Sequence, residues 1–372
     1  MIPFNKPVQL GNELEAIGRA FRGGQTAGCG PLGDLCEARL QEKLGKRVLL
    51  VSSCSHALEM AALLLDVGPG DEVILPSFTF VSTANAFVLR GARPVFADVD
   101  ESGNIDIREV ERLLTARTRA VCVVHYAGNS CDMEALAVAA RGLPVVEDAA
   151  QALGASFRGK PLGTFGFAGT ISFHETKNVG CGEGGALIVS DSDMVERAEY
   201  LREKGTNRRR FHQGLVDKYT WVDIGSSYVL SELNAAYLLP QLEAFDKIQR
   251  RRHEVFRAYE LALQAPAERA GAALLPVPPG NTSNSHLFAL VFQRGAQRAA
   301  YISHMREHGI LTPFHYVALH RSPMGQKFHD GRSLPMAEHL TDCLVRLPLF
   351  FNITDAEVET IIGRTVEFIS GL

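Results

Sequence analysis

Residues 144–178 read PVVEDAAQALGASFRGKPLGTFGFAGTISFHETKN and contain two short apolar runs that predict the fold of the chain. The runs Pro144–Glu147 and Thr170–Phe173 have the length and composition of strands that are buried on both faces of a sheet. Asp148 directly follows the first run, and Lys177 follows the second. Because ligands gather at the carboxyl ends of parallel strands, this stretch predicts both a buried sheet and the edge that carries its functional groups.

The same pattern extends outward through the first two thirds of the chain, where short apolar runs alternate with helical stretches. Five further strands are predicted at residues 48–51, 72–75, 94–97, 120–124 and 186–189, with helices at 55–65 and 83–89. Strands that alternate with helices favour an α/β architecture, in which a mostly parallel sheet is covered by helices on both faces.

The last third of the chain follows a different pattern. Residues 226–263 are predicted to be largely helical, and a smaller unit follows, with strands near 286–292 and 310–315 and a helix near 296–308. Four prolines fall within residues 265–284, which predicts a loop there. We therefore expect a large domain over residues 1–245, including an N-terminal helical segment, and a smaller α+β domain over residues 246–372.

Composition excludes several classes of protein. The chain has 372 residues and a formal net charge of −4, so it lacks the concentrated positive charge of a nucleic-acid-binding protein. No apolar run is long enough to span a bilayer, and the first residues lack the apolar stretch of a signal peptide. The seven cysteines are scattered and form no CxxC pair, which argues against a disulfide framework or a zinc knuckle. We expect a soluble, cytoplasmic protein.

The dinucleotide-binding pattern GxGxxG occurs at residues 28–33 and again at residues 180–185. Its mechanism needs a strand before the glycines and a helix after them, so that the pyrophosphate meets the start of the helix. The first match follows a helical stretch, and the second precedes a predicted strand. Both lack the required context, so a nicotinamide-dependent dehydrogenase is the weaker hypothesis.

The residues at the strand ends meet the needs of pyridoxal 5'-phosphate, which requires a lysine that forms an imine and a carboxylate beside its pyridine nitrogen. Lys177 and Asp148 can supply these groups. The turn Ser52–Ser55 precedes a predicted helix and can bind the phosphate, and Phe80 can stack on the ring. Taken singly, each has an ordinary explanation: a solvated lysine, a helix-capping aspartate or turn, and a core phenylalanine. Together they favour the cofactor.

Four segments carry a resemblance to a known family: residues 76–100, 145–163, 172–187 and 226–243. The combination of EDAAQ, SFHETKN and GEGG in the two central segments is highly specific. The chain resembles the DegT/DnrJ/EryC1/StrS family of sugar-nucleotide aminotransferases over essentially its whole length. The resemblance implies the fold-type I architecture, with a mixed, mostly parallel seven-stranded sheet in a large domain and a smaller α+β domain.

The resemblance also implies roles for individual residues. Lys177 forms the imine and carries the proton between the substrate Cα and the sugar carbon, while Asp148 pairs with the pyridine nitrogen. Gln151 lies beside the ring, Ser172 and the turn bind the phosphate, and Ser227 reaches the site of a neighbouring subunit in a homodimer with shared active sites. The implied cofactor-binding residues are Cys54, Ser55, Phe80, Asp148, Gln151, Ser172, Lys177 and Ser227.

Since the family's dehydratases carry histidine in place of the lysine, Lys177 implies transamination, with L-glutamate as the usual donor. The segments at 125–133, 173–178, 202–208, 216–228 and 314–320 resemble a subgroup that converts dTDP-4-keto-6-deoxy-D-glucose to dTDP-4-amino-4,6-dideoxy-D-galactose for common antigen and lipopolysaccharide synthesis. The same chemistry on another keto-sugar nucleotide, such as a 3-keto sugar, stays open. So does a regulatory protein that binds the cofactor without catalysis.

Contacts with the substrate are the least specific expectation. A diphosphate-bearing substrate needs cations near its entry path, which favours Lys204 and Arg208, while the neighbouring Arg202, Arg209 and Arg210 are expected on a solvated face. The spacing of His315 and His320 does not suit a shared metal site, and we expect no bound metal. The predicted substrate-contacting residues are His174, Lys204, Arg208, His315, Tyr316 and His320.

Overall fold

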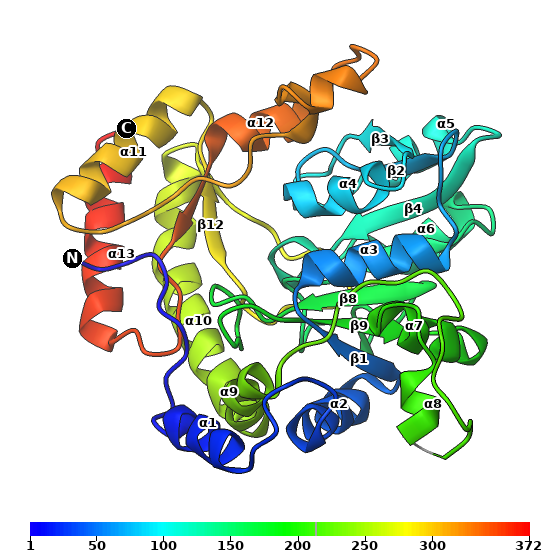
Figure 1. Cartoon of the computed structure of the whole chain (residues 1–372). Helices are drawn as coiled ribbons and strands as arrows, with labels where there is room; N and C mark the ends of the chain where they lie inside the picture. Colours follow the sequence, from blue (N-terminus) through cyan, green and yellow to red (C-terminus); the bar gives the residue numbers. More distant parts are fainter. Residues whose placement is uncertain (213) are drawn as a thin grey trace.

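The structure, a computed structural model, describes residues 1–212 and 214–372, without the side chain of His212. Seven strands form one sheet in the order β1-β9-β8-β5-β4-β2-β3 (Figure 1). They are β1 (Arg47–Val51), β2 (Glu72–Pro76), β3 (Arg93–Ala97), β4 (Thr118–Val124), β5 (Val145–Asp148), β8 (Ala168–Ser172) and β9 (Gly185–Val189). Neighbours from β3 to β8 run parallel, and β9 is antiparallel to both β8 and β1. The predicted mixed, mostly parallel seven-stranded sheet is confirmed.

The described helices alternate with these strands and then dominate the second half of the chain. They are α1 (Glu13–Arg22), α2 (Pro31–Leu44), α3 (Cys54–Leu64), α4 (Val81–Val88), α5 (Ile107–Leu113), α6 (Met133–Ala139), α7 (Val195–Arg202), α8 (Arg208–His212), α9 (Glu232–Glu243), α10 (Phe245–Arg269), α11 (Gly295–Glu307), α12 (Pro335–Cys343) and α13 (Asp355–Ile369). Short 3-10 turns occur at Tyr126–Gly128, Ser192–Met194, Leu319–Arg321 and Gly325–Lys327.

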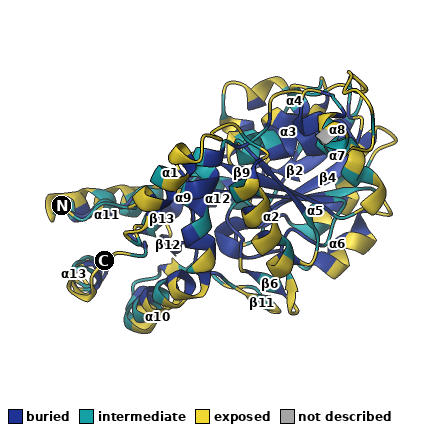
Figure 2. Cartoon of the chain, turned by 60° about the horizontal axis from the view of Figure 1, so that its bottom comes forward, coloured by how far each residue is buried: buried dark blue, intermediate teal, exposed yellow. Residues whose placement is uncertain are grey.

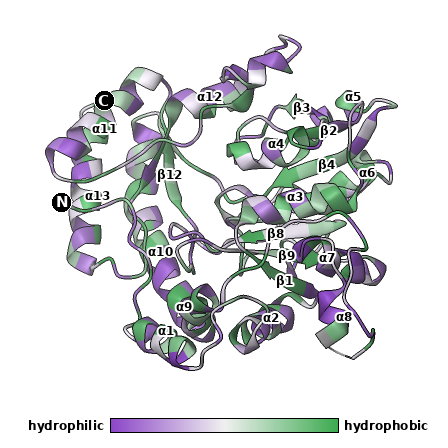
Figure 3. Cartoon of the chain, in the orientation of Figure 1, coloured by the Kyte–Doolittle hydropathy of each residue, from purple (hydrophilic) through white to green (hydrophobic). Residues whose placement is uncertain are grey.

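The sheet separates two apolar cores because successive side chains of a strand point to opposite faces. In β1, Leu49 and Val51 pack into the core that α3, α4 and α7 cover, whereas Val48 and Leu50 pack into the core beneath α2, α6 and α9. Figure 2 shows the strands buried between helices whose outer surfaces are exposed, and Figure 3 shows the matching apolar colour of the strands. The sheet is therefore buried on both faces, as the apolar runs predict.

Beyond α10 the chain builds a second, three-stranded sheet in the order β10-β12-β13. Its strands are β10 (Ala273–Leu274), β12 (Phe288–Val291) and β13 (Leu344–Leu347), and they share a third apolar core with α10, α11 and α13. A third small sheet consists of β11 (Asn281–Thr282), β6 (Ser156–Phe157) and β7 (Lys160–Pro161). Because β6 and β7 lie in the segment between β5 and β8, this sheet joins the C-terminal region to a connection of the large sheet. The predicted boundary at residue 246 lies just inside α10 and stays a prediction.

Two expectations for this region are wrong. Residues 310–315 form no strand; they make only single bridges, from Ile310 to Ile2 and from Phe314 to Val345, because this segment crosses between the two units. The expected loop at 265–284 begins later, since α10 continues through Pro266 to Arg269. Ala267 is fully buried there, and its packing holds the last helical turn in place. Among the described residues, no helix is both long and apolar enough to cross a bilayer.

Candidate active site

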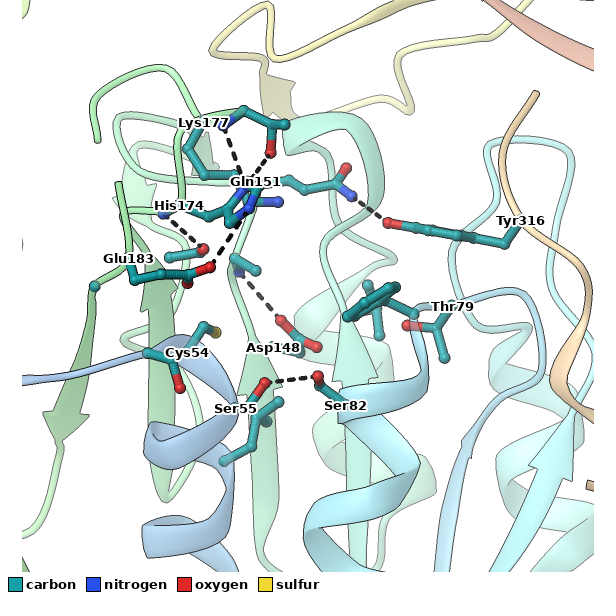
Figure 4. A pocket seen from close by; sticks show the side chains of 18 of the residues that line it. Cys54, Ser55, Thr79, Ser82, Asp148, Gln151, His174, Lys177, Glu183 and Tyr316 are labelled. Atoms are coloured by element: carbon teal, nitrogen blue, oxygen red, sulfur yellow. Dashed lines mark hydrogen bonds and ion pairs between the residues drawn. The ribbon is translucent and has the colours of Figure 1, made fainter. Parts of the chain in front are cut away.

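A cavity of about 530 Å³ opens at the carboxyl ends of β5 and β8, where the amino-terminal ends of α3 and α4 also meet (Figure 4). The sheet contributes Asp148 and Ser172, and the loop after β8 contributes Lys177. The remaining predicted site residues that line the cavity are Cys54, Ser55, Phe80, Gln151, His174, His315 and Tyr316. Ten of the predicted residues, distant in sequence, therefore surround one cavity.

Asp148 ends β5 with a side chain that is 6% exposed. Its Oδ2 accepts a hydrogen bond from the Thr83 hydroxyl at 2.7 Å, and its Oδ1 accepts one from the Ala150 amide at 3.2 Å. Both donors are neutral, so they do not compensate a buried negative charge fully. Burial accordingly raises the pKa of Asp148. A cation in the cavity beside this carboxylate would remove that penalty.

Lys177 lies in the loop that connects β8 to β9. This loop is fixed by the Lys177 amide, which donates to the His174 carbonyl at 2.9 Å, and by the Asn178 side chain, which donates to Gln249 Oε1 at 3.0 Å. The lysine side chain faces the cavity, where burial lowers the pKa of its amine, partly offset by Asp148. A lowered pKa increases the fraction of neutral amine, the form that attacks a carbonyl carbon.

The cavity floor offers hydroxyl groups and helix amides suited to a phosphate. Ser53 caps α3, the Ser55 and Ser82 hydroxyls lie 2.6 Å apart between the starts of α3 and α4, and Ser172 accepts from the His174 amide at 3.3 Å. Partial positive charge and free amides at helix starts favour anions. Cys54 also lines this floor, but burial raises the pKa of its thiol, which therefore stays protonated and is a poor nucleophile.

The opposite wall consists of amide and aromatic groups. Gln151 Nε2 donates to the Tyr316 hydroxyl at 3.0 Å (Figure 4). Its Oε1 accepts from the Ala127 amide at 2.8 Å, so both ends of the side-chain amide are held. His315 stacks on Tyr316 with ring centroids 3.6 Å apart, and burial lowers the pKa of His315 well below its ordinary value. Phe80 is 56% exposed at the rim, where its ring centroid lies 6.2 Å from that of Tyr316 and its exposed face can contact a bound molecule.

These residues fit pyridoxal 5'-phosphate on the chemistry of the structure itself. The incompletely compensated carboxylate of Asp148 suits a protonated ring nitrogen, and the hydroxyl-rich floor at two helix starts suits the phosphate. Lys177 enters the same cavity with an amine whose pKa burial lowers. The site therefore holds all three groups that the cofactor requires.

Four of the predicted residues lie outside the cavity lining. His320 is buried between Ser77 Oγ, at 2.7 Å, and Glu338 Oε1, at 3.3 Å. Lys204, Arg208 and Ser227 are exposed on a surface strip formed by the described residues of 203–227, which includes α8. The two ends of this strip are joined by an isolated β-bridge between Glu203 and Ser227. Their predicted roles in substrate and cofactor binding stay predictions, and within one chain this strip does not line the cavity.

The predicted solvated face is wrong for one of its members. Arg202 is 3% exposed and pairs with Glu37 at 2.6 Å, because α7 packs this side chain against β1 and α2. Arg209 and Arg210 are partly exposed and pair with Glu199 and Glu196. A run of basic residues in a sequence does not show which of them pairs with a buried carboxylate and which is exposed to solvent.

The sequence reasoning missed the residues that support the site. Thr83 holds Asp148, and Ala127, with φ of +59°, presents the amide that orients Gln151. Arg346 on β13 donates to the Phe314 carbonyl at 3.2 Å and covers the Phe4 ring, and its Nε is buried with no partner among the described residues. No sequence signal connects Arg346 to Lys177, although its charge helps lower the pKa of that lysine.

Comparison with known proteins gives one consistent result. The model of the DegT/DnrJ/EryC1/StrS aminotransferase family matches residues 9–366. The solved structure of the aminotransferase TlmJ from Streptoalloteichus hindustanus is 34% identical, with a TM-score of 0.91, and the match covers 100% of this chain and 99% of that one.

Two further solved structures agree. DesV of S. venezuelae, in complex with a ketimine intermediate, is 32% identical with a TM-score of 0.88, covering 96% of this chain and 94% of that one. Helicobacter pylori PseC, an aminotransferase involved in the biosynthesis of pseudoaminic acid, is 25% identical with a TM-score of 0.90, covering 99% of each chain.

Proposed function

Because the chain belongs to the DegT/DnrJ/EryC1/StrS aminotransferase family, we propose that it moves the amino group of L-glutamate to dTDP-4-keto-6-deoxy-D-glucose, giving dTDP-4-amino-4,6-dideoxy-D-galactose. The chain is a pyridoxal 5'-phosphate-dependent sugar aminotransferase. Neither a dehydrogenase nor a protein that binds the cofactor without catalysis agrees with that membership. The particular sugar, nucleotide and donor are our proposal, and so are a role in glycan or antigen synthesis and a cytoplasmic location.

One observation supports the reaction best: Lys177 and Asp148 line the same cavity. Asp148 is the last residue of β5, and Lys177 lies in the loop that follows the neighbouring strand β8. When bound, pyridoxal 5'-phosphate supplies a carbonyl carbon that accepts the amino group and a cationic ring that withdraws electrons. Asp148 would hold the proton on the ring nitrogen, and the starts of α3 and α4 with Ser172 would bind the phosphate. Gln151 would fix the ring's remaining edge.

Lys177 then serves as the attachment amine and the proton carrier. Its lowered pKa lets it accept a proton from the donor's Cα and return one to the carbon that receives the amino group. His315 lines the same cavity, but burial holds the pKa of its imidazole well below its ordinary value, which makes it a weak proton acceptor. The proton transfers are therefore assigned to Lys177.

A cation near the cavity supports a donor that carries a carboxylate. Arg346 does not line the cavity, but its charge helps lower the pKa of Lys177, and its half-buried guanidinium makes no ion pair among the described residues. Such a cation favours a carboxylate ligand. Aromatic groups at the rim, Phe80 and Tyr316, offer surfaces for a sugar or a nucleoside base. His174 also lines the cavity, and its Nε2 lies 3.7 Å from Glu183 Oε1.

We also propose a homodimer in which each subunit completes the other's site. The strip that carries Lys204, Arg208 and Ser227 exposes an unusual number of large apolar side chains, the property of a surface that a second protein covers. They are Phe211, Leu215, Tyr219, Trp221, Val222 and Ile224, with Trp221 80% exposed. Seated against a second copy, this strip brings its cations and Ser227 toward that copy's phosphate-binding floor.

The experiment that tests the reaction is the visible absorption spectrum of the purified chain with pyridoxal 5'-phosphate, before and after L-glutamate. We expect a lysine-bound cofactor band that glutamate converts to the spectrum of the aminated cofactor, and we expect Lys177→Ala to lack the first band. A panel of dTDP- and UDP-linked 3-keto and 4-keto sugars then identifies the acceptor.

Each result has a clear meaning. A band that persists in Lys177→Ala would contradict the assignment of the lysine. Faster turnover of a 3-keto sugar would replace our acceptor and leave the reaction class intact. An active monomer in sedimentation at assay concentration would overturn the shared site.

A further inference from the structure

Helices α11 and α13 lie on the outer side of the C-terminal unit (Figure 1), and two histidines and one glutamate at these helices form a cluster that does not line the cavity. His304 lies in the last turn of α11 and His308 is the C-cap residue that follows the helix, at spacing i, i+4, which places both on the same side of the helix end. Glu367 comes from α13, and one potential ligand atom from each residue lies within 4.8 Å of the other two. The set offers two imidazole nitrogens and one carboxylate oxygen, the donors of many three-ligand zinc sites.

Backbone carbonyls fix which nitrogen of each imidazole can bind a metal. His304 Nε2 lies 3.2 Å from the Arg364 carbonyl oxygen, and His308 Nδ1 lies 2.8 Å from the His304 carbonyl oxygen. A carbonyl oxygen only accepts, so these two ring nitrogens must carry the protons. The lone pairs are therefore left on His304 Nδ1 and His308 Nε2. Such hydrogen bonds to the second ring nitrogen are the usual support of histidine ligands in metal sites.

The surroundings act on a cation in two ways. Glu367 Oε2 accepts from Arg364 Nη1 at 2.7 Å, so Oε1 is the carboxylate oxygen left for a metal, which would share the carboxylate with this guanidinium. His308 follows directly on the last residue of α11, where the helix dipole is negative. His304 is half-buried with its ring 5.4 Å from that of Phe368, so one ligand is held rigidly while the two exposed ones can adjust.

In contrast to the sequence-based expectation of no bound metal, we propose that His304, His308 and Glu367 bind one zinc-type divalent cation, with water in the remaining position, and that the ion ties α11 to α13. Ligand atoms of a tetrahedral zinc site are about 3.4 Å apart, as Zn–ligand bonds of roughly 2.1 Å require. The potential ligand atoms lie within 4.8 Å of one another, so metal binding requires them to move together by at most about 1.4 Å, which rotation of the exposed His308 and Glu367 side chains can provide. Nitrogen donors select zinc over magnesium or calcium, which prefer oxygen ligands.

The test is a calorimetric titration of the chelator-treated, cofactor-loaded enzyme with ZnCl2, followed by thermal unfolding with and without the metal. The wild type should bind one equivalent that EDTA removes, and zinc should raise its unfolding temperature, because a ligand that binds only the folded state stabilises it. His308→Gln should lose this binding, and Glu367→Gln should weaken it, because each removes one of the three protein ligands. His339→Gln, on α12, is the matched control and should behave as the wild type does.

His308 and Glu367 are exposed, so neither substitution threatens the fold, and an unchanged cofactor spectrum checks that each variant is intact. Equal zinc binding by the wild type and His308→Gln would overturn the proposal, since the metal would then occupy thiols or the cofactor. So would the absence of saturable binding at millimolar zinc. Because the readouts are metal binding and unfolding, they do not depend on whether the enzyme aminates the proposed sugar.

Discussion

Glu147 and Asp148 are neighbours on β5, and both are buried, yet their surroundings differ sharply. The Glu147 carboxylate, 0% exposed, accepts from His125 Nε2 at 2.7 Å and from the Gly163, Phe165 and Gly166 amides at 2.6–2.8 Å. The Asp148 carboxylate has one hydroxyl and one amide, and burial raises its pKa. One acid is satisfied by the chain, and the other is not.

The difference teaches which acid serves the fold and which serves the reaction. Glu147 points to the face where the turn after β7 delivers three amides, so it holds that turn to β4 and β5. Asp148 points into the cavity, where a bound cationic ring would supply the missing partner. A protein that leaves a buried charge incompletely compensated at its active site gives up stability for function.

The largest effect is expected from Asp148→Asn, which removes the charge that holds the ring proton and keeps the shape. Transamination should fall about 10³-fold, in line with the loss of a preorganised electrostatic group. The Asp148→Asn apoprotein should be no less stable than the wild-type apoprotein, because an incompletely compensated buried charge is gone. Steady-state kinetics and urea unfolding of the same preparation measure both effects.

The exposed Asp246, on α10, provides the matched control for that substitution: Asp246→Asn should leave rate and stability unchanged. If Asp148→Asn destabilised the apoprotein by several kcal/mol, Asp148 would be a structural acid like Glu147, and the comparison would fail.

Glu147→Gln should show the reverse profile. Leaving His125 and one of the amides without an acceptor is expected to lower the free energy of unfolding by about 3 kcal/mol, the range found when a buried pair loses one member. Activity per folded molecule should change little, which titration of bound cofactor checks. A loss of activity at full stability would move Glu147 into the catalytic machinery.

Thr83→Val sharpens the comparison with a smaller change. It removes the hydroxyl that donates to Asp148 Oδ2, a hydrogen bond to a charged group worth roughly 1.5 kcal/mol, so turnover should fall about 10-fold. Thr83→Ser restores the hydroxyl and should restore the rate. If Thr83→Ser were as slow as Thr83→Val, the methyl group and its packing would be responsible instead.

The smallest effect concerns the pH dependence of apoprotein stability. Burial raises the pKa of Asp148 above its value in the unfolded chain. At a pH between these two pKa values, the native state therefore binds a proton that the unfolded state does not. Stability contributed by this group should therefore be present at low pH and decline as pH rises through the folded pKa. Between pH 4 and pH 8, the free energy of unfolding of Asp148→Asn should increase relative to that of the wild type as the pH rises. If the two free energies changed in parallel with pH, the raised pKa would be contradicted.

The sequence was sufficient for much of the fold and for the centre of the site. All seven strands of the large sheet lie where their apolar runs indicated, because continuous apolar segments have few alternatives to burial between helices. Lys177 and Asp148 line one cavity because parallel strands end at the same edge of a sheet. Both conclusions depend on local pattern and simple topology.

The sequence by itself determined that Glu147 and Asp148 point to opposite faces, because successive side chains of a strand alternate. It did not determine which of the two carboxylates would have its hydrogen-bonding capacity and charge compensated by the rest of the chain. That depended on turns and helices from distant parts of the chain, as did the burial of Arg202 against Glu37 and the approach of Glu367 to His304 and His308. The reason is physical. Burial follows from a residue's own apolarity, whereas the compensation of a charge depends on partners that only the tertiary structure brings within hydrogen-bond distance.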